Sequence, residues 1–325
     1  MVPFFPQWVI PAALAAAGIV LLGIGALALG LFPPLRRDLG GVANLDAEAE
    51  HVRVPLSDGD TLDAYVIEGH RPAVIVLFHG YARTHTRSWR YAQFLRGLDC
   101  HIVSFDFRSS RARRRQPTTL GGTERADAIA VLDWVAQDPR FAGCRIGFHG
   151  ESLGGAVALD LAAQRPEVAA VVADAAFAVA AHAIEDACIG MARMPRQPSA
   201  TILRSLARAF TGHDPGAFAP LDRMAGLAGR PVFFIHGDRD PRISPAQARA
   251  LWHAAGAKDP LWIVSGAKHN EAWRLARERY EQHVSAFFAR ALLDEGAGIA
   301  AGEWDNDEGE AVLLKLRPLG EGVGA

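Results

Sequence analysis

The segment Gly150-Glu151-Ser152-Leu153-Gly154 has the spacing of a turn that carries a nucleophilic serine. In a G-x-S-x-G turn the serine lies on a sharp connection between a strand and a helix, and small residues are needed two positions before and after it. The spacing alone occurs by chance in many chains. Here an apolar run at 145–148 precedes the turn and a helical pattern at 153–163 follows it. We therefore predict that Ser152 is a nucleophile; the alternative is a turn serine that caps the helix.

A serine hydroxyl needs a base within hydrogen-bond reach and a carboxylate that orients this base. His269 follows the last apolar run and precedes the final helical segment, where a base can reach the serine. Two aspartates compete for the role of the acid. Asp240 is preferred because it lies three residues beyond Gly237 and so clears the strand end, whereas Asp238 is expected to stabilise the turn. An isolated histidine usually has a structural role, but the order serine, aspartate, histidine favours catalysis.

An oxyanion formed during acyl transfer needs backbone N–H donors directed at the developing charge. Leu153, the residue after the nucleophile, is expected to supply one of them from a helix N-terminus. The loop after the apolar run at 73–78 begins His79-Gly80-Tyr81, and Tyr81 is expected to supply the second. Gly80 permits a tight backbone turn, and His79 is predicted to be a structural residue beneath the loop.

The chain that must position these residues alternates between apolar runs and helical patterns. Continuous apolar runs are typical of strands buried on both faces of a mostly parallel sheet. Their alternation with helices predicts βαβ units and a doubly wound α/β fold with helices on both faces of the sheet. Two short alternating runs before them predict a hairpin. The expected hairpin strands are 52–56 and 62–67; the expected later strands are 73–78, 101–107, 145–148, 169–173, 232–235 and 261–264; the expected helices are 88–98, 123–137, 153–163, 245–255 and 271–293.

One interval, at about 178–230, interrupts this alternation. It contains no clear strand, but it carries a helical stretch at Thr201 to Phe210. An insertion at this point lies above the carboxyl ends of the strands, where ligands bind in open α/β sheets. We predict a lid over the site; the alternative is a lateral helix with loops that touches no substrate.

The N-terminal residues 1–35 contain no charged side chain, and Trp8 to Phe32 is almost wholly apolar. As a helix this stretch would be about 37 Å long, enough to cross a bilayer with some tilt. It is predicted to be an uncleaved transmembrane anchor; the alternative is a signal peptide. Arg36 and Arg37 follow the span, so the positive-inside rule places the domain of a single-pass protein in the cytoplasm. A linker at 36–50, a catalytic domain at 51–293 and a flexible tail at 294–325 would follow.

Composition excludes several other classes of protein. The 325 residues carry a formal net charge of −2, which gives no reason to expect nucleic acid as a partner. The three cysteines, Cys100, Cys144 and Cys188, have neither zinc-site nor disulfide spacing, which favours a reducing compartment. The chain has no phosphate-cradling or dinucleotide-binding glycine pattern and no H-E-x-x-H pair. No cofactor and no metal are therefore expected.

Several of these motifs together resemble the α/β-hydrolase superfamily. They are His79-Gly80, Phe105-Asp106-Phe107-Arg108, Gly150 to Gly155, His236-Gly237-Asp238-Arg239-Asp240 and Lys268-His269-Asn270. The resemblance covers about residues 50 to 292 and is strongest to membrane-anchored bacterial members near the serine-aminopeptidase-like and dienelactone-hydrolase-like branches. It implies an α/β-hydrolase fold with a lid insertion, a triad of Ser152, Asp240 and His269, and Tyr81 and Leu153 as oxyanion donors.

The sequence departs from the pattern of this superfamily after the expected strand at 101–107. Many members have a small glycine-rich loop there, whereas this chain has five arginines in eight positions: Arg108, Arg111, Arg113, Arg114 and Arg115. A solvated surface loop, contact with anionic lipid head groups and binding of an acidic substrate group are all open.

The expected activity is hydrolysis of an ester or thioester, through an acyl-enzyme on Ser152. The apolar lid and the anchor favour a hydrophobic or lipid-like acyl substrate. A serine peptidase of the aminopeptidase kind or an acyltransferase would use the same triad. A membrane-tethered binding module without activity is the alternative outside the class of enzymes.

Overall fold

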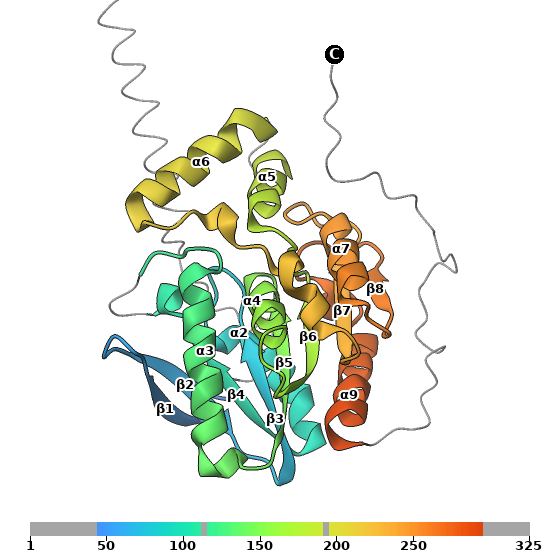
Figure 1. The fold of residues 1–325 in the computed structure, drawn as a ribbon. Coiled ribbons are helices and arrows are strands. Elements are labelled where there is room, and N and C mark those ends of the chain that lie inside the picture. The colour runs from blue at the N-terminus through green and yellow to red at the C-terminus, as the bar shows by residue number, and fades with distance from the viewer. Residues whose placement is uncertain (1–43, 112–115, 191–194, 295–325) are drawn as a thin grey trace, which may run out of the picture.

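The computed structural model describes residues 44–111, 116–190 and 195–294, and these form one eight-stranded sheet with helices on both faces (Figure 1). The strand order is β1-β2-β4-β3-β5-β6-β7-β8. The β1–β2 hairpin joins β4 antiparallel, and all pairs from β4 to β8 are parallel. The strands are β1 Glu50–Pro55, β2 Thr61–Ile67, β3 Arg71–Phe78, β4 Cys100–Phe105, β5 Arg145–Glu151, β6 Val168–Asp174, β7 Val232–Gly237 and β8 Leu261–Val264. The predicted hairpin and mostly parallel sheet are thus present.

The continuous apolar runs arise because the central strands are buried on both faces. In β3, Val74 and Val76 belong to the core on one side of the sheet, and Ile75 and Leu77 belong to the core on the other. Successive side chains of a strand point to opposite faces, so a strand covered on both sides has no position for a polar residue facing water.

Two sets of helices cover the two faces. Helices α3, α4 and α7 pack on one core and α2 and α9 on the other. The bounds are α2 His85–Leu95, α3 Gly122–Gln137, α4 Leu153–Ala162, α7 Pro245–Ala255, α8 Ala272–Leu275 and α9 Arg277–Leu293, with short 3₁₀ helices at Arg96–Leu98, Arg108–Ser110 and Pro139–Phe141. The final helix, predicted as one element, is interrupted at Ala276, whose φ of −123° and ψ of 47° are not helical. At this break Trp273 is buried and its ring lies under the guanidinium groups of Arg90 and Arg277.

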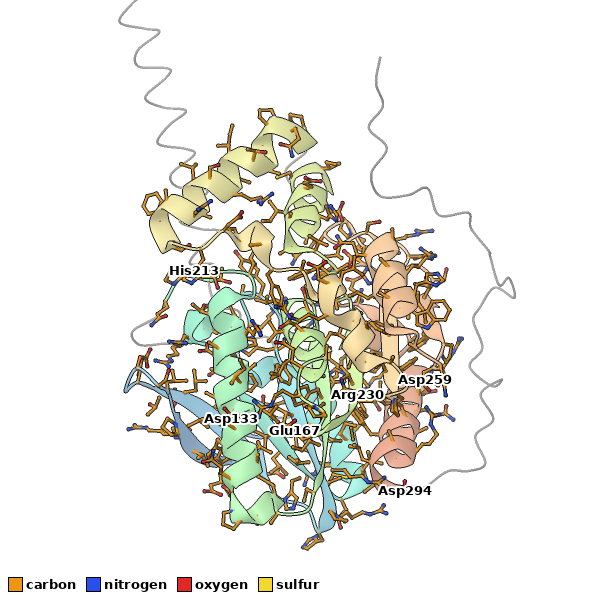
Figure 2. The ribbon with its side chains drawn as sticks, in the orientation of Figure 1. Asp133, Glu167, His213, Arg230, Asp259 and Asp294 are labelled. Atoms are coloured by element: carbon orange, nitrogen blue, oxygen red, sulfur yellow. The ribbon has the colours of Figure 1, made fainter. Side chains whose placement is uncertain are left out.

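The interval predicted as a lid contains two α-helices, α5 Ala180–Gly190 and α6 Arg196–Thr211, followed by 3₁₀ helices at Pro215–Ala217 and Pro220–Leu227. Helix α6 contains the predicted helical stretch, and α5 was not predicted. Figure 1 shows both helices beyond the end of the sheet at which α4 begins. His213, after α6, lies close to the start of α3 (Figure 2), and a Cβ on Gly122 would lie 3.4 Å from its ring. The interval therefore has the position that the lid prediction requires, and the covering of a substrate stays a prediction.

Asp186 of α5 is hydrogen-bonded to the body of the domain. Oδ2 of Asp186 accepts hydrogen bonds from the Ser244 amide at 3.0 Å and from Nε2 of Gln247 at 2.8 Å. Oε1 of Gln247 in turn accepts from the Ala178 amide at 3.1 Å. The N-cap residue and first turn of α7 therefore hold both α5 and the segment that leads into it.

Surface ion pairs lie at the end of the molecule away from α6. Arg165 contacts Asp133 of α3 at 2.5 Å and Glu167 at 2.6 Å, just before β6. Figure 2 shows Asp133 and Glu167 on the side of the molecule away from α6. Ion pairs this exposed contribute little to stability, so the two apolar cores hold the sheet and its helices together.

The last residues of the predicted linker contact the folded domain. Leu45 is buried among the side chains of the α2 and α9 core. Oδ1 of Asp46 accepts a hydrogen bond from Nε1 of Trp89 at 2.7 Å. The predicted anchor at 1–35, the remaining linker at 36–43 and the tail at 295–325 lie outside the described residues. Among the residues that the structure does describe, no helix is both long and apolar enough to cross a membrane.

Candidate active site

The turn after β5 holds Ser152 in a backbone conformation that few side chains adopt, with φ of 53° and ψ of −120°. The glycines around it are required by close backbone contacts. A Cβ on Gly154 would lie 2.3 Å from the carbonyl oxygen of Phe78, and a Cβ on Gly150 would lie 2.6 Å from the backbone of Gly154. Strain of this kind persists only where the surrounding structure fixes it, and it is common at functional sites.

The three residues predicted for the triad lie in hydrogen-bond contact. Oγ of Ser152 is 2.9 Å from Nε2 of His269, and Nδ1 of His269 is 2.6 Å from Oδ2 of Asp240. The Ser152 side chain makes no capping hydrogen bond to α4, so the alternative of a helix-capping serine is wrong. The arrangement allows His269 to take a proton from the hydroxyl while Asp240 fixes the orientation of the ring.

Asp240 is fixed as an ionised acceptor. Its side chain is fully buried, and its Oδ1 accepts hydrogen bonds from the amides of Arg242 at 2.8 Å and Ile243 at 3.0 Å. Burial by itself would raise the pKa of Asp240, but the hydrogen bond and charge of His269 outweigh burial and lower it. The competing Asp238 points elsewhere and accepts from the Gly266 amide at 2.7 Å.

The loop after β3 lies against the nucleophile, as the oxyanion prediction requires. A Cβ on Gly80 would be 3.4 Å from Cβ of Ser152. Tyr81 follows directly, and its half-buried side chain packs on the α3 and α4 core. Leu153 is the first residue of α4, so its amide is among the N–H groups that have no partner within the helix. His79 is buried beneath this loop, where its ring nitrogens contact the Gly80 carbonyl at 2.9 Å and the Phe107 amide at 3.2 Å. This is the structural role predicted for His79.

A buried polar cluster beneath the nucleophile was not found by sequence reasoning. It contains His149 and Glu151 of β5, Asp174 of β6, Tyr91 and Arg87 of α2, and Tyr280 of α9. Nε of Arg87 lies 3.1 Å from Oε1 of Glu151, and the Tyr91 hydroxyl donates to its Oε2 at 2.8 Å. On the other side, the Tyr280 hydroxyl donates to Oδ2 of Asp174 at 3.1 Å.

The two carboxyl groups of this cluster differ in protonation. Burial would raise the pKa of Glu151, but the guanidinium groups of Arg87 and Arg90 and the Tyr91 hydroxyl outweigh it and lower the pKa to about 2. Burial also raises the pKa of Asp174, and the charge of Glu151 adds to it, so this pKa reaches about 7. Glu151 is therefore ionised next to the nucleophile.

The backbone of Asp174 also contacts the nucleophile turn, since the Asp174 carbonyl accepts a hydrogen bond from the Ser152 amide at 2.8 Å.

Small and apolar side chains pack against the first turn of α4. A Cβ on Gly155, in the first turn of α4, would lie 3.2 Å from Cβ of Ala176. The Phe177 ring lies 6.0 Å from that of Phe218, which belongs to the interval between α6 and β7. Because Ala176 and Phe177 are buried in the core that includes α4, the contact with Phe218 attaches the interval between α6 and β7 to this core.

Two arginines of the basic loop have acidic partners within the fold. Nε of Arg108 lies 2.6 Å from Asp127, and its Nη1 lies 2.8 Å from Asp58. Nη1 of Arg111 lies 2.6 Å from Asp60, and its side chain is only 7% exposed. Arg108 thus links the β1–β2 turn to α3, and Arg111 binds the same turn, while the contact with anionic lipid stays a prediction. Arg113, Arg114 and Arg115 lie outside the described residues.

Comparison with known proteins assigns the family. The model of the alpha/beta hydrolase family matches residues 75–310, so the chain belongs to this family. An uncharacterized protein of Mycobacterium tuberculosis, Rv2307c, is 27% identical over 263 residues, which cover 80% of this chain and 86% of the relative.

Solved structures share the fold at low sequence identity. An esterase of Pyrococcus furiosus is similar with a TM-score of 0.65 at 21% identity, over 80% of this chain and 98% of that protein. An acylaminoacyl peptidase of Pyrococcus horikoshii is similar with a TM-score of 0.58 at 17% identity, over 78% of this chain and 43% of that protein. Hydrolases of more than one specificity therefore share this architecture.

Proposed function

We propose that this chain is a serine hydrolase that cleaves an ester or thioester of a hydrophobic acyl group through an acyl-enzyme on Ser152. The observation that supports the proposal best is the unbroken line of contacts from Ser152 Oγ through His269 to Asp240. A serine, a histidine and a buried carboxylate in this geometry form a proton-transfer unit that recurs on unrelated folds.

The proposed reaction begins when Ser152 Oγ attacks the substrate carbonyl and its proton passes to Nε2 of His269. Asp240 stabilises the resulting imidazolium, and the amides of Tyr81 and Leu153 hold the oxyanion. The proton then passes from His269 to the leaving oxygen or sulfur. Water attacks the acyl-enzyme in a second round, with His269 again as the base, and releases the acid and free Ser152.

The proposed preference for an apolar acyl group rests on the apolar residues of the interval predicted as a lid, whose Phe218 packs on Phe177. Each methylene buried there would contribute about 0.8 kcal/mol, or about fourfold in kcat/KM, until the acyl-binding surface is filled. An enzyme with a polar acyl site would show no such increase.

Labelling with a fluorophosphonate tests the nucleophile. The native chain should be labelled, Ser152→Ala should not, and Ser205→Ala, which changes an exposed serine of α6, should be labelled like the native chain. Labelling of Ser152→Ala at the native rate would overturn the assignment of Ser152, and a native chain that resists the probe would favour a binding module.

A substrate series tests the acyl preference. p-Nitrophenyl esters of increasing chain length and the matching thioesters should be cleaved with rising kcat/KM. Faster cleavage of aminoacyl amides would instead identify a peptidase, and transfer of the acyl group to an added alcohol in preference to water would identify an acyltransferase.

A further inference from the structure

Helix α6 and its neighbour α5 expose large apolar side chains to solvent. In the described parts of the chain, four large hydrophobic side chains are exposed, and three of them lie on these helices: Ile189 at 46%, Ile202 at 52% and Phe210 at 66%. On α6, Ile202 and Phe210 are separated by two turns, with the half-buried Leu206 between them. Residues four apart lie on one face of a helix, so these three form a continuous stripe, here called the apolar stripe of α6.

The apolar face of α6 is only partly used by the fold. Ala200 and Ala207, which point to the protein side of the helix, are buried. The apolar stripe lies on the flank next to this contact and is left in water. A globular surface helix normally buries its whole apolar face, so an uncovered stripe indicates a further partner.

The other flank of α6 carries the charges that identify this partner. Thr201, Arg204, Ser205 and Arg208 follow one another at spacings of three and one along the helix, and with Asp214 they line a hollow of about 180 Å³. Arg204 is held by Asp214, with contacts of 3.1 Å from Nε to Oδ1 and 2.8 Å from Nη2 to Oδ2. Glu185 of α5 also lies near Arg204, Arg208 adds a second guanidinium group to the hollow, and α6 contains no acidic residue.

We propose that α6 docks the domain on a bilayer that contains anionic phospholipids. In this arrangement the apolar stripe enters the boundary between head groups and acyl chains, and Arg204 and Arg208 contact lipid phosphate at the hollow. A helix with an apolar flank, a basic flank and no acidic residue is typical of interfacial helices. Guanidinium groups are well suited to phosphate oxygens.

The predicted anchor supports this choice of occupant. The apolar stretch ends at Phe32 and the described fold begins at Asn44, which leaves residues 33–43, eleven residues, between them. Fully extended, they reach about 37 Å, so an anchored domain stays within one domain diameter of the lipid. Helices α5 and α6 lie at the end of the sheet where α4 begins with Leu153 (Figure 1), so docking would direct the Ser152 side of the domain toward the bilayer.

Lipid quenching on the full chain in nanodiscs tests the proposal. An environment-sensitive fluorophore is attached to Ile202→Cys or Phe210→Cys, in a background in which the three native cysteines are replaced. The matched control is Gln137→Cys, an exposed position at the far end of α3 (Figure 1). Spin-labelled lipids should quench the fluorophore at 202 and 210 and leave the fluorophore at 137 unquenched.

The charge requirement is tested in the same discs. Arg208→Gln should lower the docking equilibrium about fivefold in phosphatidylserine discs, since one basic residue near such a surface contributes about 1 kcal/mol, and should change nothing in phosphatidylcholine discs. Equal quenching at 202 and 137 would overturn the proposal. So would a blue shift at 202 that needs no lipid and grows with protein concentration, because it would identify a second copy as the occupant.

Hydrogen exchange on the unmodified full chain provides a check that needs no cysteine replacement. The amides of α6 should exchange more slowly in anionic than in neutral discs, while those of α3 should not change. Equal exchange of α6 in the two kinds of disc would contradict a docking surface for anionic lipid. None of these measurements depends on hydrolase activity, so they test docking independently of the proposed function.

Discussion

Replacing Glu151 with glutamine should destabilise the domain strongly. The Glu151 side chain is fully buried, and Arg87, whose Nε contacts it at 3.1 Å, is only 6% exposed. Removing one partner of a buried ion pair leaves the other charge in a medium that solvates it poorly, at a cost of about 3–5 kcal/mol. The lost carboxylate is also an acceptor for the Tyr91 hydroxyl, a role that the glutamine oxygen can keep. The expected loss therefore comes mainly from the charge.

A double-mutant cycle separates this coupling from general damage to the core. Arg87→Met in the Glu151→Gln background removes the guanidinium that has lost its partner, so the double variant should lose less stability than the sum of the two single variants, with a coupling of about 1–3 kcal/mol. The matched control is the exposed pair of Arg96 and Glu48 at 2.8 Å, whose side chains are 46% and 49% exposed. Its coupling should not exceed about 1 kcal/mol.

Urea unfolding of the full chain in detergent measures both cycles. The emission of the seven tryptophans, among them Trp89, which is fully buried on the same helix as Arg87, follows the unfolding of the domain. Single-variant losses below about 1 kcal/mol, or additive losses in the Arg87 and Glu151 cycle, would refute the view that these charges depend on each other.

Three further predictions concern the triad, the nucleophile turn and the buried acid. Asp240→Asn should lower kcat for a p-nitrophenyl ester about 10⁴-fold, because the amide cannot hold the reactive tautomer of the base; an unchanged kcat would exclude Asp240. Gly154→Ala should lower the thermal midpoint, since the new Cβ would lie 2.3 Å from the Phe78 carbonyl, whereas Gly97→Ala meets nothing within 4 Å and should not. Burial raises the pKa of Asp174 from 3.8 to about 7. Between these two pH values Asp174 is ionised in the unfolded chain but still protonated in the native state, so native stability falls as the pH rises. Asp174→Asn should therefore gain stability relative to the native chain as the pH rises from about 4 to about 7, and a constant difference would contradict the raised pKa.

Features that depend on local sequence were predictable. The turn at Ser152 and its glycines are constrained by contacts within a few residues, so their spacing was sufficient. Asp240 could be preferred over Asp238 because each extra residue beyond a strand end changes the direction of the side chain. The position of His269 followed from chain order, since the last strand and the last helix were both recognised from their hydrophobic patterns.

Features that depend on distant partners were not predictable. Glu151 is fixed by Arg87 and Tyr91, which lie 64 and 60 residues away in the sequence, and no spacing rule connects them. The same holds for Arg108, for which the sequence left a solvated loop open. Its partner Asp127 lies on α3, and no spacing rule connects the two residues. The break at Ala276 also has a tertiary cause, because Trp273 packs into the core next to it.

Asp186 makes the position of α5 and the alignment of the triad thermodynamically linked. The amides of Arg242 and Ile243 hold Asp240, and the next amide, that of Ser244, holds Asp186 of α5. Moving α5 outward to admit a large substrate would break the contact at Ser244, directly beside the loop that orients His269. Linkage is reciprocal: a ligand that stabilises the displaced helix would loosen Asp240, and an inhibitor that mimics the oxyanion would shift the equilibrium of α5 away from the displaced position.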